Sequence, residues 1–214
     1  MSKLRFKISM SLDGYVAGPS QSVENPLGIG GMRLHEWVFP LAAWRRMHGM
    51  EGGEVNESSQ VVEESLVNIG ATIMGRNMFG GHPGPWDEGK PWNGWWGDNP
   101  PFHHPVFVLT HHARAPLKME GGTTFTFVTG GIQAALDQAR KAAGGKDISL
   151  AGGAKAAAQY LTAGLVDEME INLAPALLGS GERLFDGVGD DLHGLKLART
   201  VAAPGVVHLR FARA

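Results

Sequence analysis

The sequence predicts an α/β fold in which a mainly parallel central sheet carries helices on both faces and ends in a C-terminal antiparallel hairpin. Three observations support this prediction. Short apolar runs alternate along the chain with segments of helical periodicity, as in parallel sheets built from strand–helix–strand units. Several of these runs lead directly into glycine or polar residues. Near the C-terminus, two alternating segments flank Pro204-Gly205, which indicates a hairpin.

The first elements follow from local patterns. Apolar and polar residues alternate from Lys3 to Met10, which predicts a half-buried strand, and Asp13-Gly14 then predicts a turn. Residues 18–31 are rich in Gly, Ser, Pro and Asn and predict a loop. A helix is expected over 35–47. Pro40 marks a kink or boundary in it, because proline lacks the N–H that a helix interior uses.

A second helix is expected to begin at Ser59 as its N-cap and to end with Gly70 as its C-cap. A short apolar strand over 71–74 follows. Residues 80–105 then predict a long irregular segment, which holds four of the six tryptophans. A loop of this length and composition indicates either a functional segment or a packed lid.

The rest of the chain continues to alternate. Strands are expected over 106–110, 124–129, 147–151 and 168–173, and over the hairpin segments 195–202 and 206–211. Helices are expected over 132–143 and 154–163. In such sheets, ligands bind at the carboxyl ends of the parallel strands, so the candidate site residues are sought there.

Length and composition limit the classes of protein. The 214 residues predict one domain, 1–214, with a Trp/Pro-rich insertion at about 80–105. A net charge of −2 gives no sign of a nucleic-acid or membrane partner. The absence of cysteine excludes disulfides and cysteine nucleophiles. No apolar run approaches the roughly 20 residues of a membrane helix and no signal peptide is indicated, so a cytoplasmic protein is expected.

The strongest local signal is the run from Ile148 to Lys155, in which a strand leads into two glycines and then a helix. Glycines let a ligand approach the backbone closely, and the N–H groups of a helix N-terminus bind phosphate. A tight turn without a ligand is the alternative. The run is not the dinucleotide fingerprint of doubly wound folds, because it lacks the third glycine and the later acidic residue.

Two other strand ends carry polar groups. Arg76 follows one strand, and Thr110 and His111 end another. Arginine can bind a phosphate at such a place, and Thr and His can hydrogen-bond to it, although each feature alone is also typical of a solvated turn. Adjacent histidines at 103–104 and 111–112 do not predict a metal site. Neighbouring side chains on a strand point apart, and no carboxylate clusters with them.

Taken together and in this order, the motifs resemble the dihydrofolate reductase-like superfamily. Within it, the chain is similar to the reductase (C-terminal) domain of bacterial bifunctional riboflavin-biosynthesis deaminase/reductases. The matching segments are 9–18 (SMSLDGYVAG), 74–76 (MGR), 108–110 (VLT), 151–154 (AGGA) and 175–185 (PALLGSGERLF). They cover most of the chain, and the last segment favours the riboflavin-type branch.

The resemblance implies a largely parallel sheet and an NADPH site. NADPH is expected to be preferred over NADH, because Arg76, Thr110 and His111 lie at adjacent strand ends where an extra phosphate could be paired. The cofactor-binding residues that it implies are Ala17 and Gly18 beside the nicotinamide, Gly75, Arg76, Asn77 and Met78 at the ribose and phosphates, Thr110 and His111 near the adenosine 2′-phosphate, and Gly152, Gly153, Ala154 and Lys155 at the pyrophosphate. Residues 19–32 correspond to the mobile loop that closes over the cofactor in dihydrofolate reductase. A side chain at Gly153 is expected to fill ligand space and to force an unfavourable backbone angle.

One departure from the family pattern concerns the catalytic residue. Dihydrofolate reductase keeps a carboxylate on its first helix, where it binds and protonates the pteridine. Counting back from the Met-Gly-Arg segment, the equivalent place here is near Ser58-Ser59. The nearby carboxylates, all out of clear register, are Glu57, Glu63 and Glu64. No catalytic residue is therefore identified, and the Trp-rich segment 86–96 is expected to reshape the substrate pocket.

These observations favour an NADPH-dependent reductase of a pterin-, pyrimidine- or flavin-like heterocycle, acting by direct hydride transfer. One alternative is 5-amino-6-(5-phosphoribosylamino)uracil reductase of riboflavin biosynthesis. Its phosphorylated substrate requires a basic clamp, for which the candidates are Arg33, Arg45 and Arg46. Another alternative is a nucleotide-binding homologue without catalysis, which the missing carboxylate favours.

A homodimer is also expected. The family resemblance supports it, and so does the apolar strand that carries Met169, Ile171 and Leu173, which together with the hairpin 195–211 offers a surface for a shared sheet. The remaining partner is a small heterocyclic substrate, with no nucleic acid and no membrane.

Overall fold

A computed structural model describes residues 2–87 and 89–213 of the chain. Among these residues, nine strands form one sheet in the order β10-β11-β8-β1-β7-β3-β4-β6-β5. Their bounds are β1 (Leu4–Ser11), β3 (Ile69–Gly75), β4 (Pro105–Leu109), β5 (Leu117–Lys118), β6 (Thr124–Val128), β7 (Asp147–Gly152), β8 (Glu168–Ala174), β10 (Leu195–Ala203) and β11 (Val206–Arg213). The helices are α1 (Ala42–Met47), α2 (Glu57–Leu66), α3 (Arg76–Phe79), α4 (Gly131–Ala143) and α5 (Ala154–Thr162), with 3₁₀ turns at Gly31–Leu34 and Glu120–Gly122.

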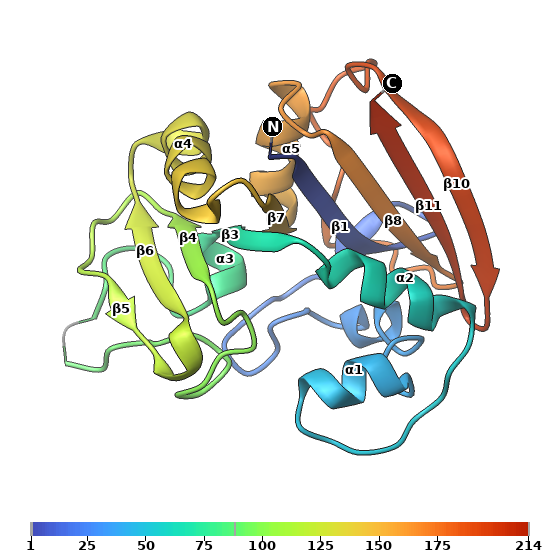
Figure 1. The fold of residues 1–214 in the computed structure, drawn as a ribbon, viewed down its shortest axis with the longest axis horizontal. Coiled ribbons are helices and arrows are strands. Elements are labelled where there is room, and N and C mark those ends of the chain that lie inside the picture. The colour runs from blue at the N-terminus through green and yellow to red at the C-terminus, as the bar shows by residue number, and fades with distance from the viewer. Residues whose placement is uncertain (1, 88, 214) are drawn as a thin grey trace.

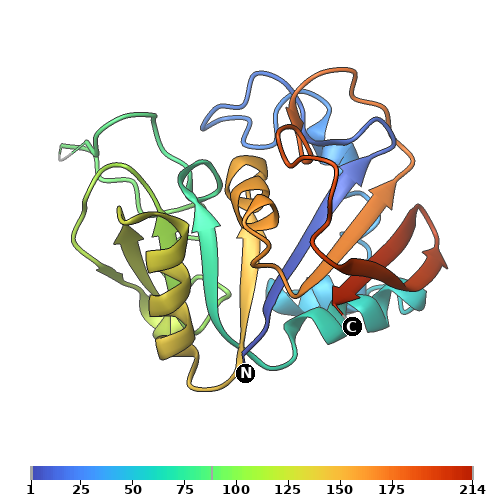
Figure 2. The ribbon, with the colours of Figure 1, turned by 90° about the horizontal axis from the view of Figure 1, so that it is seen from above.

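The predicted fold class is confirmed. The six strands from β8 to β6 in the sheet order are parallel, and β11 and β10 continue the sheet as an antiparallel hairpin. Helices α4 and α5 cover one face, and α1 and α2 lie on the other (Figure 1). Figure 2 shows the long loops gathered at the edge toward which β1, β3 and β8 point. This is the edge at which the sequence predicts the ligand.

The two faces of the sheet differ in chemistry because side chains alternate along a strand. Toward α4 and α5, the strands present a buried apolar core that includes Phe6, Ile73 and Leu150. On the other face, β4 and β6 pack against the aromatic side chains of residues 80–105. The part of this face near β1, β8 and β11 is polar, and helix α2 covers it.

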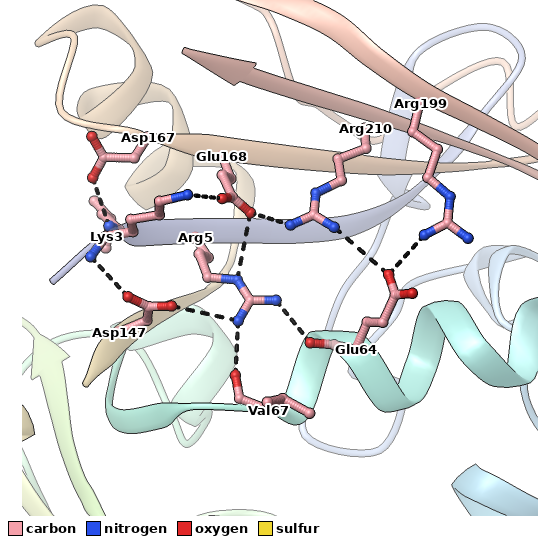
Figure 3. A network of polar contacts seen from close by, with 10 residues as sticks. Lys3, Arg5, Glu64, Val67, Asp147, Asp167, Glu168, Arg199 and Arg210 are labelled. Carbon is pink, nitrogen blue, oxygen red and sulfur yellow. Dashed lines mark hydrogen bonds and ion pairs between the residues drawn. The ribbon is translucent and has the colours of Figure 1, made fainter. Parts of the chain in front are cut away.

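An ionic network fixes α2 to this polar part of the sheet (Figure 3). Arg5 on β1 donates to the backbone carbonyls of Glu64 and Val67, each at 2.9 Å, and thereby binds the end of the helix. The Glu64 side chain accepts a 2.8 Å bond from Arg199 on β10. Arg210 on β11 lies between Glu64 and Glu168. Charged side chains can occupy this interface because almost every donor has a partner.

Two helix boundaries were predicted wrongly. Residues 35–40 form turns, and α1 begins only after Pro40 and the extended Leu41. The N-cap of α2 is Asn56, not Ser59. Ser59 lies three residues further on and accepts a 3.0 Å bond from the Asn56 N–H, so the two residues form a reciprocal capping box.

Gly70 lies in β3 and is not a helix C-cap, because α2 ends at Leu66. The need for glycine there is steric. A Cβ at this position would lie 2.6 Å from the carbonyl oxygen of Ala143, so only glycine lets the strand pass the end of α4 this closely.

A small second sheet, which the sequence analysis missed, joins two of the family-like motifs. Strand β2 (Tyr15–Ala17) pairs antiparallel with β9 (Glu182–Arg183). Asp13, in the turn before β2, accepts hydrogen bonds from the backbone N–H groups of Leu178 and Gly179. The Ser11 hydroxyl and these N–H groups lower the pKa of Asp13 to about 2. The acidic residue of the SLDG segment therefore anchors the loop before β9.

The surface suggested for a homodimer is only partly available. Met169 and Ile171 are 1% and 2% exposed and lie in the apolar core between the sheet and its helices. They cannot contact a second chain, so this basis for the dimer was wrong. The exposed strand at this edge of the sheet is β10, where Leu197 is 57% exposed.

Candidate active site

The ends of β3 and β7 meet at the carboxyl edge of the sheet. A Cβ at Gly75 would lie 3.2 Å from the Cβ of Ala156 and 3.6 Å from backbone atoms of Gly152 and Gly153. Met78 lies beside them, with its Sδ 4.0 Å from the place of a Cβ at Gly152. The structure thus brings two of the predicted strand ends together, and the tight 3.2 Å approach at Gly75 favours glycine there.

Gly152 and Gly153, which are joined by a cis peptide bond, use glycine for different reasons. Gly152 has a φ of +112°, which side chains rarely allow. Gly153 has a φ of −74°, so a side chain there causes no backbone strain, contrary to expectation. A Cβ at Gly153 would meet nothing within 4 Å. The space in front of this residue is open.

Helix α5 begins directly after this open space. Its N-cap residue is Gly153, and no side chain caps the first turn. The first N–H groups of the helix, beginning with Ala154 and Lys155, therefore point toward the open space without an intrahelical acceptor. Lys155 is exposed and lies 3.6 Å from Glu182 on β9. Open space, an uncapped helix N-terminus and a nearby ammonium group together fit a pyrophosphate.

The Arg76 side chain is engaged within the protein. Its guanidinium stacks on Trp86, 3.6 Å from the ring centroid, and donates to the carbonyl oxygens of Gly80 and His82. Arg114 lies over the same ring at 5.0 Å. Burial and the nearby Arg114 lower the pKa of Arg76. The Arg76 Nε is buried without a partner among the described residues, so this cationic pair is under-satisfied.

Thr110 and His111 follow β4, next to β3 in the sheet. The Thr110 hydroxyl accepts a 3.1 Å bond from the N–H of His112, so it stabilises its own turn. His111 and Asn77 are exposed. Asn77, Thr110 and His111 thus lie at the predicted edge of the sheet, but their side chains do not converge on one point. Among the residues that the structure describes, no group of three metal-ligating side chains gathers there or elsewhere.

Ala17 and Gly18 lie in a different set of contacts. The Gly18 N–H donates to the carbonyl of Leu27 at 2.8 Å, which closes the loop predicted to be mobile. A Cβ at Gly181 would lie 2.1 Å from the carbonyl oxygen of Ala17. The structure thus joins Ala17 and Gly18 to the loops around 27 and 181, and no described contact joins them to Gly152 and Gly153.

A cavity of about 320 Å³ extends from Ala151, near the end of β7, along the polar face of the sheet, between the end of α2 and residues 101–104. Its lining includes Met78 and Ala151, which adjoin Gly152. Pro101, Phe102 and His104 from the end of the long irregular segment also line it, whereas no described residue of the Trp-rich segment 86–96 does. The size and largely apolar lining suit a heterocycle.

The Trp-rich segment is firmly packed. The indole N–H groups of Trp86, Trp92 and Trp95 donate to the carbonyls of His112, Phe79 and Met78, each at 2.8 to 2.9 Å. Trp96 packs against Phe102 and Phe125. The sequence predicted either a functional segment or a packed lid. The structure is better described as a packed lid over α3 and β4.

No carboxylate of α2 takes the place of the one in dihydrofolate reductase. Ser58 is buried and bonds His208 on β11. Glu63 pairs with Arg46 at 2.9 Å on the surface, Glu64 belongs to the ionic network, and Glu57 is exposed. None of the three lines the cavity.

The structure brings two carboxyl groups into the cavity, those of Glu168 and Glu170, and neither was among the predicted site residues. Glu170 on β8 lines the cavity beside Lys7 on β1, its register neighbour. A signal was present in the sequence, because Glu168, Glu170 and Asn172 alternate along a strand in the interior of the sheet. Polar residues on one face of such a strand indicate a solvated or ligand-binding surface.

Comparisons with known proteins agree with this geometry. Residues 2–209 match the RibD C-terminal domain family. The chain belongs to this family. Since the match covers nearly the whole chain, the resemblance to the reductase part of riboflavin-biosynthesis enzymes is confirmed. Membership of the RibD C-terminal domain family also supports the predicted oxidoreductase activity on a pyrimidine- or pterin-like heterocycle.

Solved structures show the same fold as this RibD C-terminal domain. A protein named for riboflavin biosynthesis, from Shewanella sp. PV-4, has 19% identity and a TM-score of 0.58, over 100% of this chain and 99% of that one. The deaminase/reductase of Thermotoga maritima has 13% identity and a TM-score of 0.57. The match covers 100% of this chain but only 57% of that protein. Dihydrofolate reductase from Enterococcus faecalis, solved with NADP(H), has 12% identity and a TM-score of 0.50, over 99% and 96% of the chains. Among curated protein sequences, none matches this domain.

Proposed function

We propose that the protein is an NADPH-dependent reductase that acts on a pterin-, pyrimidine- or flavin-like heterocycle by direct hydride transfer. The observation that carries this proposal is the junction of the Gly75 and Gly152-Gly153 strand ends, which lies before the uncapped N-terminus of α5 and beside Met78 and Ala151, two residues that line the 320 Å³ cavity. The family supports it, and so does the NADP(H) in the Enterococcus faecalis enzyme.

Each group of predicted residues has a place in this proposal. The backbone N–H groups at the start of α5 and the Lys155 ammonium bind the pyrophosphate, while Gly75 and Met78 border the ribose. The 2′-phosphate lies near Arg76, Thr110 and His111. The nicotinamide lies near Ala17 and Gly18. The bound cofactor supplies the hydride. The cavity walls exclude water and align the acceptor ring.

NADPH is expected to bind more tightly than NADH, and Arg76→Gln is expected to reduce this preference about tenfold. Two guanidinium groups around Trp86 create a positive potential that favours an additional phosphate, and a charge-assisted contact contributes roughly 1.5–3 kcal/mol. Calorimetric titration with both cofactors measures the ratio. Arg76 also binds loop carbonyls, so the substitution can destabilise the loop. The melting temperature of the same variant shows this effect separately from the change in the ratio of NADPH to NADH affinity. Equal affinities in the unmodified protein would contradict the NADPH assignment.

A substrate without a phosphate is expected to react faster than 5-amino-6-(5-phosphoribosylamino)uracil. The cations on the cavity wall are engaged: Lys7 donates to Ser65 at 2.6 Å, Arg5 to two backbone carbonyls, and Arg210 to Glu168. The clamp candidates Arg33, Arg45 and Arg46 do not line this cavity. The family favours the phosphorylated substrate as the second candidate.

The test is NADPH oxidation, followed at one cofactor concentration with a panel of pterins, pyrimidines, flavins and the phosphoribosylamino-uracil. Faster turnover of the phosphorylated compound would favour the riboflavin-pathway step. Tight NADPH binding without oxidation by any compound would favour the non-catalytic homologue.

The homodimer and the cytoplasmic location remain proposals, as does the single-domain organisation of residues 1–214. Among the described residues, no helix combines the length and the apolar character that crossing a membrane requires. The partner that the cavity suits is a small heterocyclic molecule.

A further inference from the structure

Among the charged and titratable side chains that line the cavity, Glu170 differs from the others. Glu168 accepts hydrogen bonds from Lys3 and Arg210, and His104 bonds the Thr72 hydroxyl at 2.7 Å. For the Glu170 carboxyl group, the structure of residues 2–87 and 89–213 shows no hydrogen bond and no ion pair, and its Oε1 is fully buried. A buried polar atom without a partner destabilises a fold, so its presence in a pocket points to a ligand.

The position of Glu170 relative to the strand ends suits a heterocycle. Its register neighbour on β1 is Lys7, one residue beyond the Phe6–Leu150 pair that joins β1 to β7. Glu170 therefore lies near the level of Ala151, the residue before Gly152, with β1 between the two strands. A ring that lies across β1 reaches Glu170 with one edge and the strand end of β7 with the other.

The charges around Glu170 come from every element that packs against it. Lys7 and Arg5 on β1 and Arg210 on β11 favour its ionised form, whereas Glu64 on α2 opposes it. Burial outweighs these charges and raises the pKa of Glu170. The same burial lowers the pKa of Lys7. The carboxyl group is thus able to hold a proton at the wall of the cavity.

We propose that Glu170 binds the ring N–C–NH₂ edge of the heterocyclic substrate and donates the proton that accompanies the hydride. This inference rests on the proposed reductase function. The Glu170 proton passes to a ring nitrogen of a C=N bond, and the hydride from the dihydronicotinamide adds to its carbon. The π bond breaks, N–H and C–H bonds form, the substrate is reduced and the nicotinamide is oxidised. Solvent water returns a proton to the carboxylate after product release.

The test uses 2,4-diaminopyrimidine as a probe, because its N–C–NH₂ edge pairs with a carboxylate through two hydrogen bonds. Calorimetry is expected to show that Glu170→Gln weakens probe binding about tenfold to a hundredfold and leaves NADPH affinity unchanged. Glu170→Asp, which keeps the carboxyl group, is expected to retain most of the affinity. The control is Glu63→Gln, at a surface carboxylate outside the cavity, which is expected to change neither.

The melting temperature of the Glu170 variants distinguishes a role in substrate binding from a role in stabilising the fold. Since the unpartnered carboxyl group destabilises the free protein, Glu170→Gln is expected to leave Tm unchanged or to raise it. A marked fall in Tm, unchanged probe affinity in Glu170→Gln, or no probe binding by the unmodified protein would each overturn the proposal. Probe binding that depends on Glu170 in a protein that does not bind NADPH would instead overturn the proposed reductase function and retain the Glu170 site.

Discussion

Replacing Gly153 with valine is expected to lower NADPH affinity about a hundredfold and the free energy of unfolding by only about 1 kcal/mol. The side chain would enter the open space in front of α5, where no protein atom lies within 4 Å of a Cβ. There it would displace the pyrophosphate from the helix N–H groups. The φ of −74° is compatible with valine, and the small loss of stability reflects only the poorer N-cap.

The adjacent glycine provides the control. Gly152→Val is expected to lower Tm substantially, because its φ of +112° strains any side chain. Calorimetry with NADPH and thermal melting are measured on both variants. If Gly153→Val bound NADPH as tightly as the unmodified protein, the assignment of this turn to the pyrophosphate would be falsified. If the two variants lost stability equally, the turn would need both glycines for its geometry alone.

Acidification from pH 6.5 to about pH 4 is expected to lower the free energy of unfolding by up to about 3 kcal/mol through one buried residue, His208. His208 is 2% exposed. Its Nε2 lies 2.9 Å from the Ser58 hydroxyl on α2, and its Nδ1 lies 2.7 Å from the Asn172 amide oxygen on β8. The edge of Trp37 packs against the ring, with 5.0 Å between centroids. This group of side chains joins α2 to two strands of the sheet.

Burial is the main reason that the pKa of His208 falls from 6.5 to about 4, and the charges of Lys7 and Arg199 add to it. Between these two pH values the unfolded chain binds a proton that the folded chain excludes. Above pH 6.5, His208 therefore does not lower the free energy of unfolding. As the pH falls from 6.5 toward 4, the free energy of unfolding decreases. Urea unfolding at several pH values in this range measures the effect.

The matched variant for this prediction is His208→Gln, which keeps hydrogen-bonding groups but does not titrate. At pH 7 it is expected to be less stable by about 1–2 kcal/mol, because an amide cannot reproduce both ring contacts. Its stability should depend less steeply on pH between 6.5 and 4. Acidic groups such as Asp13 affect both proteins equally, so the difference isolates His208. Equal slopes in the two proteins would contradict this account.

The sequence by itself determined the fold class and directed the search for a candidate site to the carboxyl edge of the sheet. Periodicity predicted eight of the strands and the helices α4 and α5 within one or two residues, since both depend on local patterns of apolar residues. The two- and three-residue strands β2, β5 and β9 were missed, because they are too short to show a period. The Gly152-Gly153 turn was found because a strand, two glycines and a helix are consecutive in the chain. Pro40 was predicted as a kink or a boundary, and the structure shows the boundary, whereas the N-cap of α2 was placed at Ser59 and not at Asn56. Several residues there are compatible with a turn or a cap, and long-range packing selects among them.

Only the tertiary structure decided which polar side chains have partners. The prediction that Arg76 binds a phosphate did not include the stacking of its guanidinium on Trp86 or its hydrogen bonds to carbonyls that follow it in the chain. In the sequence Glu170 is one of several alternating polar residues, and only the fold showed that it lines a cavity and that its Oε1 has no hydrogen-bond partner among the described residues. The physical reason is common to both cases. Whether a charged group is satisfied depends on atoms brought near by the topology of the sheet and by long loops, and no local pattern records those distances.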